Sequence, residues 1–209
     1  LQWAARCIDV HSKPEQSLFG IVQGGTHHDL REWCAEELRE MDFDGYAVGG
    51  VSVGEGTELR QEMTEFTADL LPRKQPRYLM GVGFPEDILH AIGAGIDMFD
   101  CVAPTRMGRN GTAFTAHGRL RIKKSTYRND PKPVEEGCSC PCCRVYCRGY
   151  VSHLFRCDEM LGPILLSLHN LTFYHRMMKR AREAVRKGRF QSFRDEFVSR
   201  YRETEDMPC

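Results

Sequence analysis

The chain has 209 residues, of which 41% are hydrophobic, enough for one large or two small domains with a buried core. Its 29 basic and 29 acidic residues cancel, so the overall charge indicates no particular partner. The sequence contains no secretory signal and no long apolar run. We therefore expect a cytoplasmic protein without a membrane partner.

The first residues have the pattern of a helix but lack a helix start. Residues 1–11 are helix-like, yet neither an initiator Met nor an N-capping residue precedes them. We therefore expect the chain to be part of a longer protein.

Residues 18–105 repeat one pattern: a short apolar run, a polar or glycine-rich tip, then an amphipathic stretch. This pattern predicts strands at 18–22, 46–48, 77–80 and 96–99, and helices at 26–41, at 57–71 and from Pro85. Leu30, Cys34 and Leu38 have the spacing of one face of the first helix. Thr57 is the expected N-cap of the second helix.

Strands that alternate with helices predict parallel βαβ units. Four such strands with polar tips fit one half of a (β/α)8 barrel, in which the active site lies at the carboxyl ends of the strands. A small doubly wound sheet fits the same four strands, so both architectures stay open at this point. Beyond them, 113–128 has a β-like pattern, and helices are predicted at 148–161, 163–187 and 190–201.

Charge is distributed unevenly along the chain. Residues 29–69 are rich in acids, and a basic strip follows: Arg106, Arg109, Arg119, Arg121, Lys123, Lys124 and Arg128. Such a strip favours a local site for a polyanion, although it is equally typical of a solvated surface.

Four cysteines between 138 and 143 are too close together for ordinary mutual disulfides. Cys138, Cys140 and Cys143 offer three soft ligands, and a distant imidazole would complete the closed tetrahedron of a structural zinc site. Cys142 is a poorer partner for Cys140 than Cys143, whose two-residue spacer turns both sulfurs inward. His153 and His169 compete for the fourth position on spacing alone.

Asp100 ends a predicted buried strand, where a carboxylate is costly unless it is hydrogen-bonded or takes part in chemistry. Many aspartates at strand ends merely cap a turn. Equivalent strand tips, however, carry an amide, approachable backbone and an apolar side chain: Gln23, Gly49, Gly50, Met80 and Gly81. This set suits a flat heterocycle with hydrogen-bond donors and acceptors.

Several motifs resemble, in order and spacing, the tRNA-guanine transglycosylases (queuine tRNA-ribosyltransferases). They are GIVQGG at 20–25, VGG at 48–50, YLMGVG at 78–83, FDCVAPTR at 99–106, GRNG at 108–111, the cysteine cluster and LHN at 168–170. The resemblance implies a (β/α)8 barrel with an inserted zinc-binding subdomain. It divides the chain into 1–112, the C-terminal half of the barrel, and 113–209, the zinc-binding subdomain with C-terminal helices.

The family replaces guanine at the wobble position of certain tRNAs with a 7-deazaguanine. By position, the resemblance implies that Asp100 is the nucleophile that attacks the ribose. It implies that Gln23, Gly49, Gly50, Met80 and Gly81 hold the base, and that Arg106 and Arg109 grip the anticodon nucleotides. It also implies that Cys138, Cys140, Cys143 and His169 bind one structural Zn²⁺, and that the protein is a homodimer.

Two departures from the family pattern limit these expectations. The family's N-terminal half barrel, with its general acid/base aspartate, is missing from this sequence, so we expect the isolated segment to be inactive. Phe84 stands where bacterial members often carry Lys. The stretch VSV at 51–53 resembles the bacterial form and favours 7-aminomethyl-7-deazaguanine over queuine as the incoming base.

The alternative to an enzyme is a non-catalytic tRNA-binding or dimer-partner subunit, which would be expected to lose Asp100. A third possibility, the archaeal-type relative, is disfavoured because no appended RNA-binding domain is visible.

Overall fold

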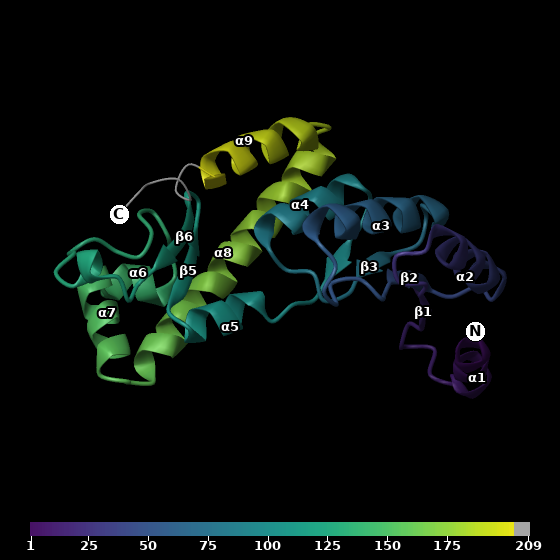
Figure 1. Ribbon diagram of the computed structural model, residues 1–209, viewed down its shortest axis with the longest axis horizontal. Helices are drawn as coiled ribbons and strands as arrows, with labels where there is room; N and C mark the ends of the chain where they lie inside the picture. The colour runs from purple at the N-terminus through teal and green to yellow at the C-terminus, as the bar shows by residue number, and fades with distance from the viewer. Residues whose placement is uncertain (203–209) are drawn as a thin grey trace. The chain divides into compact units, whose positions relative to one another are not determined.

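The computed structural model describes residues 1–202, which fold as two compact units. The first is Leu1–Cys101, and the second begins at Val102 (Figure 1). The sequence placed the boundary eleven residues later, after 112. The unit boundary is earlier because helix α5 (Ala103–Arg109) packs along helix α8 (Leu161–Arg186) of the second unit. Residues 203–209, the end of the second predicted domain, lie outside the described residues.

The first unit contains one parallel sheet of four strands in the order β1-β2-β3-β4. The strands are β1 (Phe19–Val22), β2 (Gly45–Val48), β3 (Arg77–Leu79) and β4 (Met98–Phe99). Helices α2 (His28–Glu40), α3 (Thr57–Leu70) and α4 (Pro85–Gly93) connect them in turn. Spatial order equals chain order without a reversal, unlike the doubly wound alternative. The parallel α/β class is therefore confirmed, and the closed barrel stays a prediction.

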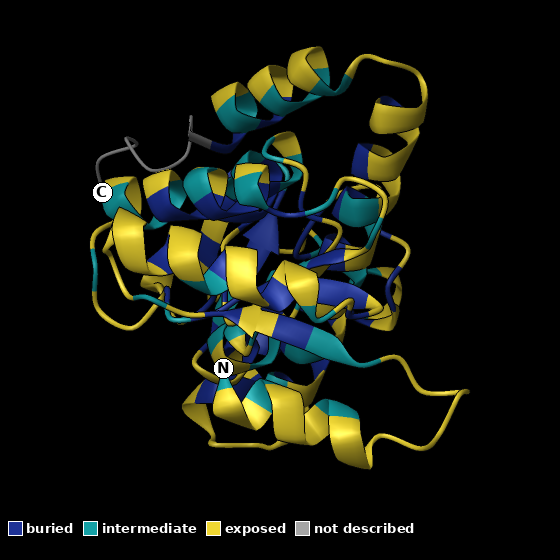
Figure 2. Ribbon diagram, turned by 90° about the vertical axis from the view of Figure 1, so that its right-hand side faces the viewer, coloured by how far each residue is buried: buried dark blue, intermediate teal, exposed yellow. Residues whose placement is uncertain are grey.

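The core of this unit lies on the strands and the inner sides of the helices, which Figure 2 shows in dark blue. β2 is buried along its whole length, and Val22, Tyr46 and Val48 are at most 1% exposed. The preceding helix α1 (Gln2–Val10) also packs against this core through Ala4 and Ile8. Burial on this scale is the main favourable term that holds the strand ends in place.

The second unit is built around the long helix α8. Its other elements are the antiparallel hairpin β5 (Thr112–Thr115) and β6 (Gly118–Arg121), a 3-10 turn η1 (Ser125–Tyr127), and helices α6 (Pro141–Val145), α7 (Arg148–Arg156) and α9 (Phe190–Arg202). Helices α5, α6, α7 and α9 and strand β5 all pack against α8. None of the helices within 1–202 is both long and apolar enough to cross a membrane.

Two predictions about helices α2 and α3 were wrong. The inner face of α2 is formed by Arg31, Ala35 and Leu38, and Leu30 is exposed. The sequence pattern assigned this face to apolar residues, whereas it includes an arginine whose three guanidinium nitrogens are each hydrogen-bonded. The N-cap of α3 is Gly56, so Thr57 is the first helical residue.

The helix predicted over 148–161 ends at Arg156. Asp158 adopts a left-handed conformation (φ 53°), and the N–H of Glu159 bonds back to the carbonyl of Leu154, which closes the helix end. Helix α8 then begins at Leu161, two residues before Pro163. Helices α5 and α6 were not predicted because both are short.

Gly108 allows α5 to approach the backbone of α8 closely. A Cβ at this position would lie 2.8 Å from the backbone nitrogen of Ser167 and 2.9 Å from its Cα. Gly108→Ala should therefore force the two helices apart and destabilise their contact by about 2 kcal/mol, the usual cost of overpacking. Amide hydrogen exchange in α8 measures this loss. Asn110→Ala, at the exposed end of the same helix, is the control and should change exchange little. Equal exchange in α8 of both variants would show that the approach of α5 to α8 does not depend on Gly108.

Candidate functional site

Asp100 lies directly after β4 and is hydrogen-bonded by two donors, one from the neighbouring strand β3 and one from the loop that follows it. The Tyr78 hydroxyl donates to Asp100 Oδ1 over 2.6 Å, and the N–H of Gly81 donates to the same oxygen over 2.9 Å. The parallel register, which pairs Tyr78 with Met98 and Leu79 with Phe99, sets this alignment. The carboxylate is therefore held in a defined orientation although the residue is exposed.

These donors also determine the protonation state of the pair. The hydrogen bond from Tyr78, followed by that from the Gly81 N–H, lowers the pKa of Asp100 below its ordinary value. The same hydrogen bond, with a smaller effect of burial, raises the pKa of Tyr78 to about 12. At neutral pH the pair is therefore a carboxylate and a neutral phenol that donates to it.

Gln23, Gly49 and Gly50 lie together at the carboxyl ends of β1 and β2. A Cβ at Gly49 would lie 2.6 Å from Gln23 Nε2, and a Cβ at Gly50 would lie 2.8 Å from Gln23 Oε1. The two glycines thus leave the space that the Gln23 amide occupies. Met80 follows β3, is half-buried, and donates its N–H to the carbonyl of Val48 over 3.2 Å.

A loop after β2 links these strand ends, and the sequence did not indicate it. The carboxylate of Glu55 accepts from the N–H groups of Ser52 and Val53, the latter over 2.9 Å. Burial alone would raise the pKa of Glu55, but these backbone donors lower it. The Ser52 hydroxyl in turn donates to the carbonyl of Gly81 over 3.5 Å, which connects the tip of β2 with the tip of β3.

Arg31 was also missed as a functional candidate. Its side chain is 0% exposed and reaches the loops that contain Gln23, Gly49 and Gly50. A signal was present in the sequence, because Arg31 stands four residues before Ala35 and seven before Leu38, on the face that is buried.

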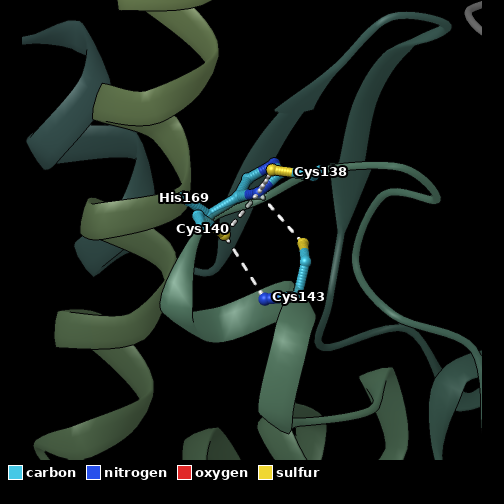
Figure 3. Close-up of side chains that lie close together, drawn as sticks. All are labelled: Cys138, Cys140, Cys143 and His169. Atoms are coloured by element: carbon cyan, nitrogen blue, oxygen red, sulfur yellow. Dashed lines mark hydrogen bonds between the residues drawn. The ribbon is translucent and has the colours of Figure 1, made fainter.

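The second unit contains a cluster of four side chains that could hold a metal ion: Cys138, Cys140, Cys143 and His169 (Figure 3). His169 projects from α8, and the cysteines come from the loop before α6 and from α6 itself. Their ligand atoms all lie within 4.8 Å of one another. The four residues form a candidate metal site, and the structure brings together the members that the family resemblance implied.

The spacing within the cluster matches a tetrahedral ion. The Nδ1 atom of His169 lies 3.7, 3.6 and 3.3 Å from the sulfurs of Cys138, Cys140 and Cys143 respectively. With ordinary zinc bond lengths, the S–N edge of a tetrahedron measures about 3.6 Å. The donor set, three sulfurs and one imidazole, is also the one that a structural zinc site uses.

The other nitrogen of His169 fixes which atom faces the sulfurs. Nε2 lies 2.8 Å from the carbonyl of Phe114, to which it donates, so Nδ1 directs its lone pair towards the cysteines. A lone pair on Nδ1 that faces three sulfurs is the arrangement in which a histidine can serve as the fourth metal ligand.

Asn170, next to the histidine, anchors the same strand. Its Oδ1 accepts from the N–H of Phe114 over 2.9 Å, and its Nδ2 donates to the carbonyls of Pro104 and Thr112 over 2.8 and 3.0 Å. His169 and Asn170 thus bind the carbonyl and the N–H of one residue, Phe114. The role of Asn170 was not foreseen, although a buried Asn beside a ligand is a signal of such a clamp.

The two competing ligands lie elsewhere. Cys142 is 0% exposed and packs in the hydrophobic core of the second unit. His153 lies on α7 beside Cys157, with its ring nitrogens 3.7 and 3.8 Å from the Cys157 sulfur. Neither belongs to the candidate metal group found among the described residues.

The basic residues of the predicted polyanion site belong to the second unit. Arg106 and Arg109 are exposed on α5, and Arg119 and Arg121 are exposed on β6. The alternation along β6 places both arginines on one face of the hairpin, opposite the buried Leu120.

Comparison with known proteins decides the family. The model of the queuine tRNA-ribosyltransferase family matches residues 1–203. The chain belongs to this family. A queuine tRNA-ribosyltransferase of Pelotomaculum thermopropionicum is 51% identical over 200 residues, and one of Bacillus subtilis is 49% identical over 201 residues. Each alignment covers 96% of this chain, but 54% and 53% of the respective relative. The chain thus spans about half the length of the curated relatives it matches, and the resemblance to the C-terminal portion of the family is confirmed.

The link between Tyr78 and Asp100 makes a prediction for titration. Asp100→Ala removes both the acceptor and the negative charge, so the pKa of Tyr78 should fall from about 12 towards its ordinary value near 10. Tyr78→Phe should conversely raise the pKa of Asp100, because the ionised form loses its main donor. Nuclear magnetic resonance of ¹³C-labelled tyrosine and aspartate measures both values.

Asp97→Ala is the matched control for this titration. Asp97 accepts from the backbone N–H of Arg77, at the opposite end of the same pair of strands. The substitution should leave the pKa of Tyr78 unchanged. A Tyr78 pKa that stays near 12 in Asp100→Ala would contradict the assigned contact.

Proposed function

We propose that this chain supplies the catalytic aspartate of a tRNA-guanine transglycosylase. The enzyme would exchange guanine at the wobble position of tRNA for 7-aminomethyl-7-deazaguanine. The ionised, doubly hydrogen-bonded carboxylate of Asp100 is the observation that carries the proposal. The family membership supports the reaction class.

In the proposed first step, the Asp100 carboxylate attacks C1′ of the ribose. A C–O ester bond forms and the C1′–N9 bond breaks, so that guanine leaves with the bonding electrons and takes up a proton. In the second step N9 of the incoming base attacks C1′, loses its proton, and displaces the carboxylate. Two inversions give net retention, as in retaining glycosidases.

The environment of Asp100 suits both steps. Tyr78 and Gly81 both donate to Oδ1, so we propose Oδ2 as the attacking oxygen. The lowered pKa keeps the nucleophile ionised at neutral pH without a separate base. The same two donors stabilise the carboxylate when it is displaced in the second step.

The neighbouring strand ends are proposed to hold the base. Gln23 and Gly50 would form hydrogen bonds with its edge, and the half-buried Met80 would stack on its face. Gly49 and Gly81 allow close approach to the backbone. Val53 is 82% exposed on the loop after β2, where it is available to an incoming base.

Arg106 and Arg109 are proposed to bind the anticodon backbone. Both are exposed cations on one short helix, which suits phosphate contacts to a splayed loop. The homodimer stays a prediction. The stacked rings of Tyr146, at the end of α6, and of Tyr150, exposed on α7, have centroids 5.1 Å apart and are a candidate part of its interface.

The alternative is a non-catalytic tRNA-binding or dimer-partner subunit. Such a subunit would have no use for a carboxylate that two donors keep ionised and aligned. Asp100 is exposed, and at such a position these contacts are not needed to offset burial. We therefore favour the enzyme.

Trapping of the covalent intermediate tests the reaction. In the full-length gene product, wild type mixed with substrate tRNA should yield a protein–RNA adduct on denaturing gels. Asp100→Asn should abolish both the adduct and guanine exchange, because a neutral amide is a poor nucleophile. Asp97→Asn is the control and should leave both intact. An undiminished adduct in Asp100→Asn would refute the assignment of the nucleophile.

We further propose that Cys138, Cys140, Cys143 and His169 bind one structural Zn²⁺. The closed set of four ligands leaves no position for a reactive water, so the ion would brace the second unit rather than take part in catalysis. It would fasten the cysteine loop to α8 and, through His169 and Phe114, to β5.

Metal analysis of purified variants tests this proposal. Inductively coupled plasma mass spectrometry should find one zinc per chain in the wild type. Cys140→Ala and Cys143→Ala should lose this zinc. Cys142→Ala should retain the zinc, because Cys142 lies between Cys140 and Cys143 in the sequence but is not a member of the cluster. A chelator should increase hydrogen exchange in α6 and β5. Equal zinc loss in Cys142→Ala, or a different metal in the wild type, would refute the site as assigned.

A further inference from the structure

Arg31 is the largest fully buried side chain of the first unit, and its position next to the proposed base pocket requires an explanation. Its Nε donates to the carbonyl of Gly25 over 2.7 Å. Its Nη2 donates to the carbonyls of Gly49 and Gly50 over 3.0 and 3.3 Å, and its Nη1 donates to the Thr67 hydroxyl over 3.3 Å. One guanidinium therefore connects the loop after β1, the loop after β2 and helix α3.

The contacts to Gly49 and Gly50 fix the direction of two peptide groups. In a trans peptide the C=O and the following N–H point in opposite directions. Because Arg31 binds the carbonyls of Gly49 and Gly50, the N–H groups of Gly50 and Val51 point away from the guanidinium. Gly50 has a φ of 65°, a conformation that favours glycine and that these bonds help to hold.

The contact to Gly25 acts on the other loop. Gly25 follows Gln23 by two residues, and the Gln23 amide lies against Gly49 and Gly50. Arg31 thus restrains the backbone on both sides of this amide. The rigid fork of a guanidinium can bind three carbonyls at once, which a single ammonium group cannot do with the same geometry.

We propose that Arg31 is a positioning residue for base recognition. It holds the loops that contain Gln23 and Gly50 so that the Gln23 amide and the Gly50 N–H face the heterocycle together. The inference rests on the proposed function for the identity of the ligand, a purine or 7-deazapurine. The hold of Arg31 on the two loops is independent of that identity.

The chain offers a matched control. Arg77 is also buried, at 6% exposure, and also donates to backbone carbonyls, those of Leu71 and Pro72. It stands at the first residue of β3, whereas Arg31 binds loops at the carboxyl ends of β1 and β2. Arg31→Met and Arg77→Met therefore remove comparable buried contacts at opposite ends of the strands.

Hydrogen exchange in the full-length gene product tests the hold on the loops. Arg31→Met should speed exchange of the amides at 23–26 and 49–52 by about tenfold, because three carbonyls lose their donor. Arg77→Met should leave these amides unchanged. Arg31→Lys, which keeps the charge but lacks the fork, should lie between wild type and Arg31→Met, and it replaces Arg31→Met if that variant fails to fold. Unchanged exchange at 49–52 in both Arg31 variants would overturn the inference.

Steady-state guanine exchange tests the consequence for recognition. Arg31→Met should raise KM for the base by about tenfold, the equivalent of one hydrogen bond, and leave KM for tRNA within about twofold. Arg77→Met should change neither the KM for the base nor the KM for tRNA. An Arg31→Met variant with unchanged KM for the base would overturn the role in recognition. A wild type without exchange activity would refute the proposed function alone, since the hydrogen-exchange experiment still decides whether Arg31 holds the loops.

Discussion

The parallel pairing of four strands in unbroken chain order is the constraint on which the candidate site depends. Each strand ends at the same edge of the sheet, so residues separated by as many as 77 positions, from Gln23 to Asp100, are carried to that edge by backbone hydrogen bonds. The register of β3 against β4 then brings Tyr78 and Gly81 to Asp100. A shift of this register by one residue would turn Tyr78 to the other face of the sheet and remove the main donor of the carboxylate.

The two units contain different candidate sites. The first unit contains the hydrogen-bonded carboxylate of Asp100 and the loops of the proposed base pocket, whereas the second contains the four candidate metal ligands and the exposed basic residues. Both units use buried polar side chains to fix backbone. Arg31 binds three carbonyls in the first, and Asn170 with His169 binds both polar groups of Phe114 in the second. Buried polar groups with all these partners define one backbone geometry, since an unpaired alternative is costly.

The sequence predicted the features that follow from local patterns. The four strands were found because short apolar runs end in glycine-rich tips, and the cysteine spacing indicated the metal cluster. The features it did not predict depend on contacts across the fold. Helical spacing places Arg31 on the buried face of α2, but its charge argues against burial, and only the carbonyls of distant loops make that burial favourable. The donor role of Tyr78 likewise requires the β3–β4 register, and the end of α7 at Arg156 depends on the backbone conformation of Asp158.

The proposed reaction requires that Asp100 form the covalent bond to the ribose. Peptide mapping by mass spectrometry of the trapped and nuclease-digested adduct locates that bond directly. The account predicts a ribonucleotide remnant on the peptide that contains Asp100, attached to the carboxylate itself and removed by the incoming base. A remnant on another carboxylate, or an exchange reaction that proceeds with Asp100 unmodified throughout, would contradict it.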